Sequence, residues 1–415
     1  MPNPIDRRSD VIVMGGGPVG LTLALALARQ GATCRIVDPM PREAMVAPHS
    51  DGRASALSST SWQMLDNLGL AATLKPKACA IAGISVCEAL KPGALDFHAA
   101  QNPGDNPADA MGAMLANHDL RLALLAAIDA NRDIDVQFGQ AVEHVAIADD
   151  GAFVTLGDGA TFGAALLIGA DGRGSPTRER AGIAMAQWRY RQAGITATIA
   201  HERDHGHVAY QIFYPAGPLA VLPLNDDEQG RHRSSIVWTV PQDRENAYTA
   251  LSDRAFAAEL AAHMGGFLGD VETLSPRVGF PLGYHAAASM VAPRVALVGD
   301  AAHGIHPIAG QGLNLGLRDA AALAEIIGEA IRLGLDPADA VMLGRYESWR
   351  AFDNLGMGVA TDLLNRLFAI PGASASKLRR LGMSAVQRTG LARQFFVDEA
   401  RGTSGELPKL LQPAA

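Results

Sequence analysis

The chain has 415 residues, a formal net charge of −8 and 48% hydrophobic residues. A chain of this length can bury a large core and should fold without disulfides or structural metal ions. Its apolar runs fall short of the roughly 20 residues of a membrane-spanning helix, and we expect neither a transmembrane helix nor export. No long basic block offsets the acidic charge, so composition argues against nucleic acid and for a small-molecule partner. The three cysteines, without metal-ligand spacing, indicate reduced thiols and no metal site.

The first predicted unit is a strand, a glycine loop and a helix. An apolar strand over 10–14 leads into GGGPVG and then into an apolar helix that ends at Gly31. In this G-x-G-x-x-G spacing, Gly15 permits the turn, Gly17 lets the backbone approach a pyrophosphate, and Gly20 lets the helix pack on the strand. A second strand over 34–38 ends in Asp38, which is expected to bind a ribose hydroxyl. The unit predicts a dinucleotide site without separating FAD from NAD.

Helical and strand patterns alternate through the next part of the chain. A helix is predicted over 56–70, and another begins near Asn117, which is either its N-cap or a polar group at a cofactor diphosphate. Strand-like segments follow at 134–138, 142–147 and 153–156. A fully apolar strand over 164–169 then feeds the turn that begins at Asp171.

Between about Trp188 and Arg277 the pattern changes to alternating strands with glycine, proline and charged turns. The strand-like segments are 194–201, 207–214, 219–224 and 234–240. This pattern predicts a mostly antiparallel sheet inserted into the nucleotide-binding domain. Tyr210, Phe213 and Tyr214 either line an aromatic pocket or take part in ordinary sheet packing.

A third strand–loop–helix unit starts at Val295. The apolar strand over 295–298 is broken by Gly299 and Asp300, and a helix follows from Gly312. Its apolar residues recur at helical spacing, while Arg318, Asp319, Glu325 and Glu329 lie mostly off that stripe. Free N–H groups at the helix start favour an anion or an electron-rich ring, and Asp300 is placed to accept hydrogen bonds from ligand hydroxyls.

The C-terminal part, from Arg345 to about Ala400, is predicted to be helical. Its apolar positions are interpreted chiefly as core, with closure of a hydrophobic pocket or contact with a membrane surface as alternatives. These positions are Leu363, Leu364, Leu367, Phe368, Leu378, Leu381, Phe395 and Phe396.

The run HPIAGQGLNLGLRD at 306–319 resembles the signature of the ubiquinone-biosynthesis hydroxylases, a branch of the FAD-dependent aromatic monooxygenases similar to para-hydroxybenzoate hydroxylase. The Asp171 segment resembles the family fingerprint that serves both FAD and NAD(P)H binding. The resemblance implies that FAD is held by Gly15, Gly17, Pro18, Gly20, Asp38, Arg53, Asn117, Arg121, Asp171, Gly299, Asp300, Pro307, Gly310, Gly312, Leu313 and Asn314. It implies a substrate pocket lined by Tyr210, Phe213, Tyr214, Leu222 and Pro223, although the arginine that relatives often carry before residue 217 is missing here.

The resemblance also implies a fold and a domain organisation. The fold class is α/β, with a Rossmann-like FAD-binding domain, an inserted mostly antiparallel substrate sheet and a helical C-terminal region. The expected FAD-binding domain comprises 1–76, 101–184 and 278–342, the substrate domain 77–100 and 185–277, and the helical region 343–415.

The implied reaction is hydroxylation of the aromatic ring of a polyprenylated phenol or quinol intermediate of ubiquinone synthesis, with NADH or NADPH and O2. No protein nucleophile is required, because the flavin carries the chemistry. A lipid tail implies a cytoplasmic protein associated peripherally with the inner face of the cell membrane. A ubiquinone-biosynthesis complex and a homodimer are candidate assemblies. The alternatives are the same chemistry on a soluble aromatic acid or phenol, and a flavin-binding complex member without turnover.

Overall fold

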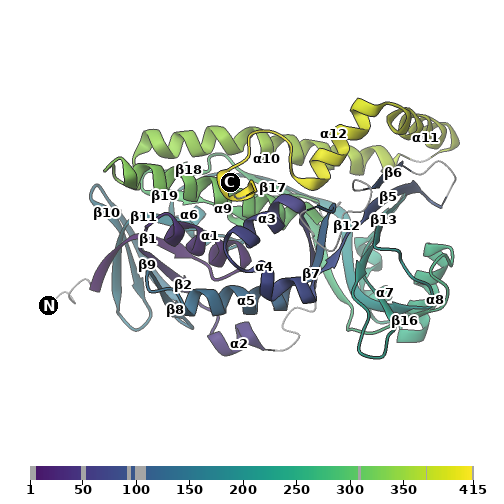
Figure 1. The fold of residues 1–415 in the computed structure, drawn as a ribbon, viewed down its shortest axis with the longest axis horizontal. Helices are drawn as coiled ribbons and strands as arrows, with labels where there is room; N and C mark the ends of the chain where they lie inside the picture. Colours follow the sequence, from purple (N-terminus) through teal and green to yellow (C-terminus); the bar gives the residue numbers. More distant parts are fainter. Residues whose placement is uncertain are drawn as a thin grey trace.

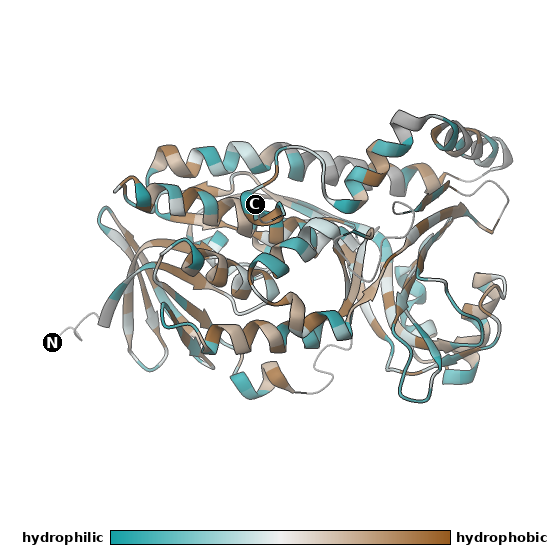
Figure 2. Cartoon of the chain, in the orientation of Figure 1, coloured by the Kyte–Doolittle hydropathy of each residue, from teal (hydrophilic) through white to brown (hydrophobic). Residues whose placement is uncertain are grey.

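The fold is described from a computed structural model that covers residues 6–47, 53–90, 95–98, 109–306, 310–370 and 372–413. Two large sheets stand side by side along the long axis, and long helices run across one side of both (Figure 1). Hydrophobic residues concentrate in the strands and in the helices that cover them (Figure 2). The fold is α/β with a second sheet domain and C-terminal helices, as predicted.

The first sheet has eight strands with a parallel centre. Its parallel order is β8-β2-β1-β11-β19, and β9, β10 and β18 add antiparallel pairs at its edges. The predicted strands of this region all occur, with ends shifted by a few residues. Their bounds are β1 Asp6–Met14, β2 Cys34–Asp38, β8 Ile134–Phe138, β9 Val142–Ala148, β10 Gly151–Leu156, β11 Thr161–Gly169, β18 Val291–Ala292 and β19 Val295–Leu297.

The helices that pack on this sheet bury its apolar face. Val11, Ile12 and Val13 are fully buried, and they belong to the same core cluster as the apolar residues of α1. Helix α1 also contacts α5 and α9, so three helices share one core. The helices of this part are α1 Pro18–Arg29, α2 Arg42–Val46, α3 Ser59–Asn67, α4 Ala71–Leu74, α5 Asn117–Asp129, α6 Pro176–Arg180 and α9 Gln311–Arg332, with short 3₁₀ turns η1 Lys75–Lys77 and η3 Gly299–Ala301.

The second sheet has nine strands in the order β20-β17-β12-β15-β14-β13-β5-β6, with β16 beside β12. Among the described pairs only β13 and β5 run parallel, so the sheet is mostly antiparallel as predicted. It continues through β17 and β20, beyond the expected domain boundary at 278. Its elements are β5 Gly83–Glu88, β6 Leu95–His98, β12 Met185–His201, β13 Val208–Tyr214, β14 Gly217–Leu224, β15 His232–Pro241, β16 Val271–Thr273, β17 Val278–Ala287 and β20 His303–Gly304, flanked by η2 Gln242–Arg244, α7 Glu245–Thr249 and α8 Asp253–Met264.

A small third sheet joins the two large ones and corrects two predictions. It consists of β3 Ala54–Ser58, β7 Gly112–Ala116 and β4 Cys79–Ala80. The predicted helix over 56–70 was wrong at its start, because β3 pairs with β7 and the Ser58 side chain caps α3. Asn117 is the first residue of α5 and Ala116 is the N-cap, so the predicted cap was wrong by one residue.

The C-terminal region consists of α10 Ala340–Ala369, α11 Ala373–Arg388, α12 Gly390–Arg401 and the 3₁₀ turn η5 Lys409–Leu411. The helices occur as predicted, but the core interpretation of their apolar residues was largely wrong. Phe368 is buried, whereas Leu363, Leu381 and Phe395 are at least 60% exposed. In the part of the chain that is described, no helix is both long and apolar enough to cross a membrane.

Candidate functional site

Three loops meet at one edge of the first sheet. The strands β1, β11 and β19 are parallel neighbours, and their last residues Met14, Gly169 and Leu297 lie in register. The loops that follow are the three motifs recognised in the sequence. Strand β2 ends beside them, because Val37 is in register with Met14. In open parallel sheets, ligands bind at the carboxyl ends of the strands where the strand order reverses, and β1 lies at such a point here.

The first loop is shaped by its glycines. Gly15 has φ +113°, and a Cβ atom there would lie 2.4 Å from the carbonyl oxygen of Ala170. A Cβ at Gly20 would lie 2.0 Å from the carbonyl oxygen of Gly15, so α1 can start this close to the strand only with glycine. At Gly17 a Cβ would meet no atom within 4 Å. Gly17 is the N-cap of α1 without a side-chain cap, and Pro18 follows at the first turn.

Asp38 lies at the end of β2, where a ribose ligand was predicted. Its Oδ2 accepts a hydrogen bond from the Gly16 N–H at 2.6 Å, and its Oδ1 accepts from the Met40 N–H at 2.7 Å. Asp38 therefore fixes the glycine loop, and each oxygen keeps a further lone pair for a ligand hydroxyl.

Two of the predicted polar cofactor residues, Asn117 and Arg121, lie on α5. The Asn117 N–H donates to the Arg53 carbonyl oxygen at 2.9 Å, and Asn117 Oδ1 accepts from the Ser55 hydroxyl at 2.6 Å. Arg121 donates to the Met45 carbonyl oxygen at 3.4 Å, and the Met45 side chain lies over Gly16. Arg121 is therefore connected to the first loop through Met45, whereas Asn117 is connected to the segment of Arg53 and Ser55.

Asp171 binds its own loop. It accepts hydrogen bonds from the Ser175 hydroxyl and from the Thr177 N–H, the latter at 2.9 Å. Arg178, which is buried, donates to the carbonyl oxygen of Ala301 at 2.9 Å. The second loop is thereby tied to the third, and the described contacts of Asp171 organise the turn.

The third loop places an exposed carboxylate at the sheet edge. Gly299 has φ +58°, and the Asp300 side chain is exposed next to it. The Asp300 carbonyl oxygen accepts a hydrogen bond from His285 Nε2 at 2.8 Å. The backbone of Asp300 is therefore fixed while its carboxylate stays open, which suits a residue that accepts from ligand hydroxyls.

The start of α9 contacts β3 of the third sheet. Gly310 is its N-cap with φ +65° and provides no side-chain cap, and a Cβ at Gly312 would meet no atom within 4 Å. Asn314 is buried, and it accepts from the Ser58 N–H and donates to the Ala56 carbonyl oxygen, both at 2.9 Å. Leu313 is half-buried against the main core. Pro307, the remaining predicted cofactor residue, lies outside the described residues.

A buried network behind this loop was missed in the sequence. Asp319, predicted off the apolar stripe, is fully buried, and Arg318 is 9% exposed. Asp319 Oδ2 accepts from the Gly299 N–H at 3.0 Å and from His303 Nε2 at 2.6 Å, and its Oδ1 accepts from Arg350 Nε at 2.8 Å. Burial alone would raise the pKa of Asp319, but the charges of His303 and Arg350 outweigh it and hold the pKa below its usual range.

His306 lies deep beside the second sheet. Its ring is fully buried, and neither ring nitrogen has a hydrogen-bond partner among the described residues. Burial lowers the pKa of His306 to about 4, so the ring is neutral at neutral pH. It packs edge-on against Tyr190, with ring centroids 5.2 Å apart, and the Tyr190 hydroxyl donates to Asp362 at 2.7 Å.

A cavity of about 1170 Å³ extends from the start of α9 between the second sheet and the C-terminal helices. The residues that α9 contributes are mainly polar, whereas the sheet and the last helices contribute mostly apolar side chains, with Gln211 and Arg379 among the exceptions. The α9 lining includes Gln311, Asn314 and Arg318. The apolar lining includes Ile84, Val86, Leu95, Phe97, Phe213, Leu222, Phe368, Met383, Phe395 and Phe396. The cavity is therefore polar at one end and apolar over most of its length.

The predicted substrate residues divide between the two faces of the second sheet. Tyr210, Phe213 and Leu222 line the cavity, although the Tyr210 ring also packs against Phe267 with centroids 4.6 Å apart. Tyr214 and Pro223 are not part of the described lining. The Tyr214 hydroxyl instead donates to the His263 carbonyl oxygen on the outer face. Alternation along β13 could have placed Gln211 and Phe213 on the cavity face and Tyr214 on the other, whereas it would also have placed Tyr210 with Tyr214 and so missed its contribution to the cavity lining.

Comparison with known proteins gives a family. The profile of the FAD binding domain family matches residues 8–351. The chain is 41% identical to the ubiquinone hydroxylase UbiL of Rhodospirillum rubrum over 98% of this chain and 93% of that protein. It is 32% identical to the 3-demethoxyubiquinol 3-hydroxylase of Escherichia coli over 96% of this chain and 99% of that protein.

Solved structures share the fold at lower sequence identity. The p-nitrophenol 4-monooxygenase PnpA of Pseudomonas putida superimposes with a TM-score of 0.79 at 20% identity, over 96% of this chain and 99% of that chain. The Diels-Alderase PyrE3 superimposes with a TM-score of 0.73 at 23% identity, over 96% of this chain and 81% of that chain. Because proteins with such different names share it, the fold does not determine the reaction.

Proposed function

Since the chain belongs to the ubiquinone-biosynthesis hydroxylases and carries an FAD binding domain, we propose that it hydroxylates the aromatic ring of a polyprenylated phenol or quinol precursor of ubiquinone. The co-substrates in this proposal are O2 and NADH or NADPH. FAD supplies the redox chemistry when bound, and the protein supplies binding, orientation and exclusion of water.

The observation that carries the proposal is the two-part lining of the cavity. A prenylated phenol has a small polar ring and a long apolar tail. The polar end of the cavity, at Gln311 and Arg318, adjoins the loop at Gly310 that the proposal assigns to the flavin ring. The apolar remainder offers the volume and surface for a tail, and removing that tail from water is favourable.

The described residues fit a bound FAD. The uncapped start of α1 at Gly17 presents N–H groups to a diphosphate, and Asp38 and Asp300 offer carboxylate oxygens to hydroxyls of the adenosine and ribityl parts. The N-terminus of α9 directs partial positive charge at the proposed ring position, where negative charge on a reduced ring would be stabilised.

The cations of the cavity bear on the choice of substrate class. A soluble aromatic acid would need a cation for its carboxylate. Arg318 lies 3.1 Å from Asp353, and Arg379 lies 2.6 Å from Glu88, so both lining arginines already have acidic partners. This pairing favours a substrate whose ring end is neutral, as in a phenol, over an aromatic acid.

The prenyl tail places the proposed reaction at a lipid surface. We therefore extend the proposal to peripheral contact with the inner face of the cell membrane. A complex with other enzymes of the pathway and a homodimer are further candidate assemblies. Both can be examined by the mass of the purified particle.

The test measures the product directly. Purified FAD-loaded protein would be given NADH or NADPH, O2 and a prenylated phenol, and the product would be analysed by mass spectrometry. The proposal expects substrate-dependent oxidation of the nicotinamide and a product heavier by one oxygen atom. An FAD-loaded protein that oxidises no nicotinamide with any prenylated phenol would instead be a flavin-binding protein without this turnover. Turnover restricted to soluble aromatic acids would overturn the assigned substrate class.

A further inference from the structure

The C-terminal helices carry a charge pattern unlike the rest of the chain. Residues 363–397 contain six basic residues and no acidic residue, in a chain whose net charge is −8. The six are Arg366, Lys377, Arg379, Arg380, Arg388 and Arg393. Two of them have acidic partners elsewhere, Arg366 in Asp362 and Arg379 in buried Glu88. Lys377 and Arg388 are exposed whereas Arg379 is buried, so these two residues supply cations that the stretch presents at the surface of an acidic protein.

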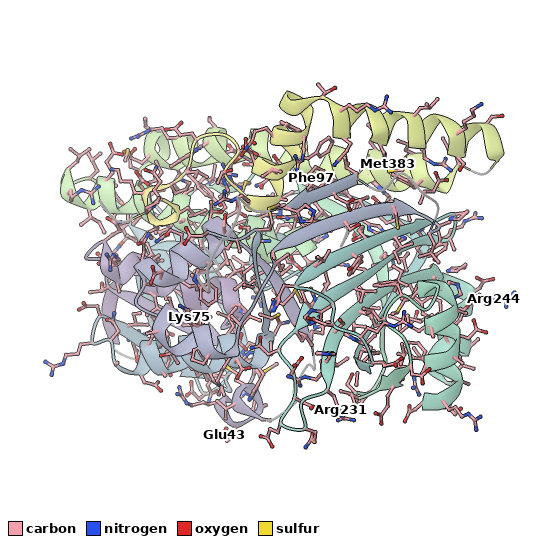
Figure 3. The ribbon with its side chains drawn as sticks, turned by 45° about the vertical axis from the view of Figure 1, so that its right-hand side comes forward. Glu43, Lys75, Phe97, Arg231, Arg244 and Met383 are labelled. Atoms are coloured by element: carbon pink, nitrogen blue, oxygen red, sulfur yellow. The ribbon has the colours of Figure 1, made fainter. Side chains whose placement is uncertain are left out.

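Helix α11 separates an inner face from an outer face. Arg379, Met383 and Val386 follow one another at helical spacing and line the cavity. Met383 lies beside Phe97 of β6 beneath the C-terminal helices (Figure 3). Lys377 and Arg388 are exposed on the opposite face, and Leu381, which is 60% exposed, lies between them in sequence on that face. Along the outer face of α11, an exposed leucine therefore lies between a lysine and an arginine in sequence.

Exposed apolar residues surround the open end of the cavity. Four large hydrophobic residues of the described cavity lining are also exposed, and all four come from the C-terminal helices. They are Leu367, Ile370, Phe395 and Phe396. Leu363, which is 63% exposed, continues the Leu367–Ile370 stripe by one turn of α10. The cavity therefore opens onto exposed apolar side chains of the C-terminal region.

We propose that this C-terminal face, made of Leu363, Leu367, Ile370, Lys377, Leu381, Arg388 and Phe395, docks the protein on an anionic lipid bilayer with the cavity mouth against the membrane. The inference rests on the proposed function for its reason, since a prenylated substrate has to leave the bilayer. Phosphate headgroups attract the lysine and arginines, and the exposed leucines and phenylalanine enter the acyl boundary. Helices α11 and α12 lie at the end of the molecule farthest from the N-terminus, so the first sheet points away from the bilayer (Figure 1).

The test uses the full-length, FAD-loaded protein and sedimentation with vesicles. Vesicles of phosphatidylcholine alone are compared with vesicles that also contain phosphatidylglycerol, at low and high salt. We expect retention on the anionic vesicles that falls as salt rises. The double variant K377E/R388E should bind them at least roughly 25-fold more weakly, since each cation near an anionic surface contributes about five-fold.

Matched variants separate this face from general charge and hydrophobicity. R244E/R254E makes the same charge change at exposed sites outside the face, and Arg244 projects from a different edge of the molecule (Figure 3). L363S/L381S removes two exposed leucines outside the cavity lining. Its control, L333S/V341S, replaces two apolar side chains elsewhere that are 63% and 73% exposed. The inference expects weakened binding only for K377E/R388E and L363S/L381S. Equal losses in the control variants would overturn it.

Failure of docking and failure of the proposed function give different results. Vesicle binding requires no turnover, and nicotinamide oxidation with a short-tailed, detergent-soluble phenol requires no vesicle. Wild-type protein that turns over this phenol but sediments with neither vesicle overturns the docking inference alone and assigns the face to a protein partner. Salt-sensitive binding lost in K377E/R388E supports the docking inference, even where the phenol is not turned over.

Discussion

Replacing Asp319 by asparagine tests whether the buried network holds the third cofactor loop. The Asp319 carboxylate accepts from the Gly299 N–H, from His303 and from Arg350 at distances between 2.6 and 3.0 Å, with no solvent exposure. Asparagine preserves the shape but removes the charge and one acceptor oxygen. Among the described residues, fully buried Arg350 then keeps Asp353 as its one acidic partner.

The expected loss of stability follows from the burial of both partners. Breaking a buried ion pair by removing one partner costs about 3–5 kcal/mol, because the remaining charge stays out of water. Asp319→Asn should therefore lower the free energy of unfolding in urea by that amount. It should also weaken FAD binding, because Gly299 is no longer held. Glu329→Gln is the matched control, since Glu329 pairs with Arg345 on the exposed side of the same helix and its loss should leave no resolvable change.

The pH dependence has a definite sign. The folded-state pKa of Asp319 lies below its ordinary value of 3.8, so its contribution is fully present above that value and is lost as pH falls through the folded-state pKa. The difference between wild type and Asp319→Asn should therefore shrink only in strong acid. A variant that unfolds within about 1 kcal/mol of wild type and retains FAD equally would refute the role of Asp319.

Three further predictions concern the cofactor loop, the buried histidine and the cavity. Gly17→Ala should keep the fold, because its Cβ would meet no atom within 4 Å, yet release FAD on gel filtration, whereas Gly20→Ala should lower the melting temperature. Burial lowers the pKa of His306 to about 4, so the ring must stay neutral in the folded protein. The free energy of unfolding should therefore fall by about 1.4 kcal/mol per pH unit from about pH 6.5 down to 4. This slope should be smaller in His306→Phe. Phe213→Ala removes a ring that is stacked on Phe368 with ring centroids 3.9 Å apart. It should raise KM roughly tenfold for a long-tailed phenol and leave kcat for a short-tailed phenol unchanged. An equal rise in KM for the two phenols would contradict a tail-binding role.

Local patterns sufficed to predict the strand–loop–helix units that meet at the edge of the first sheet. The glycine spacing at Gly15–Gly20 and the acidic end of β2 are encoded within a few residues of one another. Parallel strands then bring the ends of β1, β11 and β19 to one edge whatever the length of chain between them. The same reasoning failed at 56–70, where the pairing of β3 with β7 overrides the helical pattern.

Long-range contacts decided the features that the sequence did not reveal. Asp319 lies next to Arg318 on α9, and both looked like surface residues by helical periodicity. Each is buried because α10 supplies a partner, Arg350 for Asp319 and Asp353 for Arg318. In the opposite sense, Leu363 and Leu381 have the spacing of core residues but lack a covering element in the described chain. Periodicity identifies a helix face, whereas burial depends on what packs against it.

Helix α9 couples the cofactor loops to the cavity. Its first turn, at Gly310 to Asn314, borders the cavity. Gly316, one turn further, lies so close to the first loop and to the start of the third that a Cβ there would be 2.7 Å from Val19 Cγ2 and 3.2 Å from Gly299 Cα. Substitutions along this helix should therefore change FAD affinity and substrate KM together. Substitutions in the second sheet, such as at Leu222, should change KM alone. Measuring FAD affinity and KM for a variant therefore distinguishes an effect on α9 from an effect on the cavity wall.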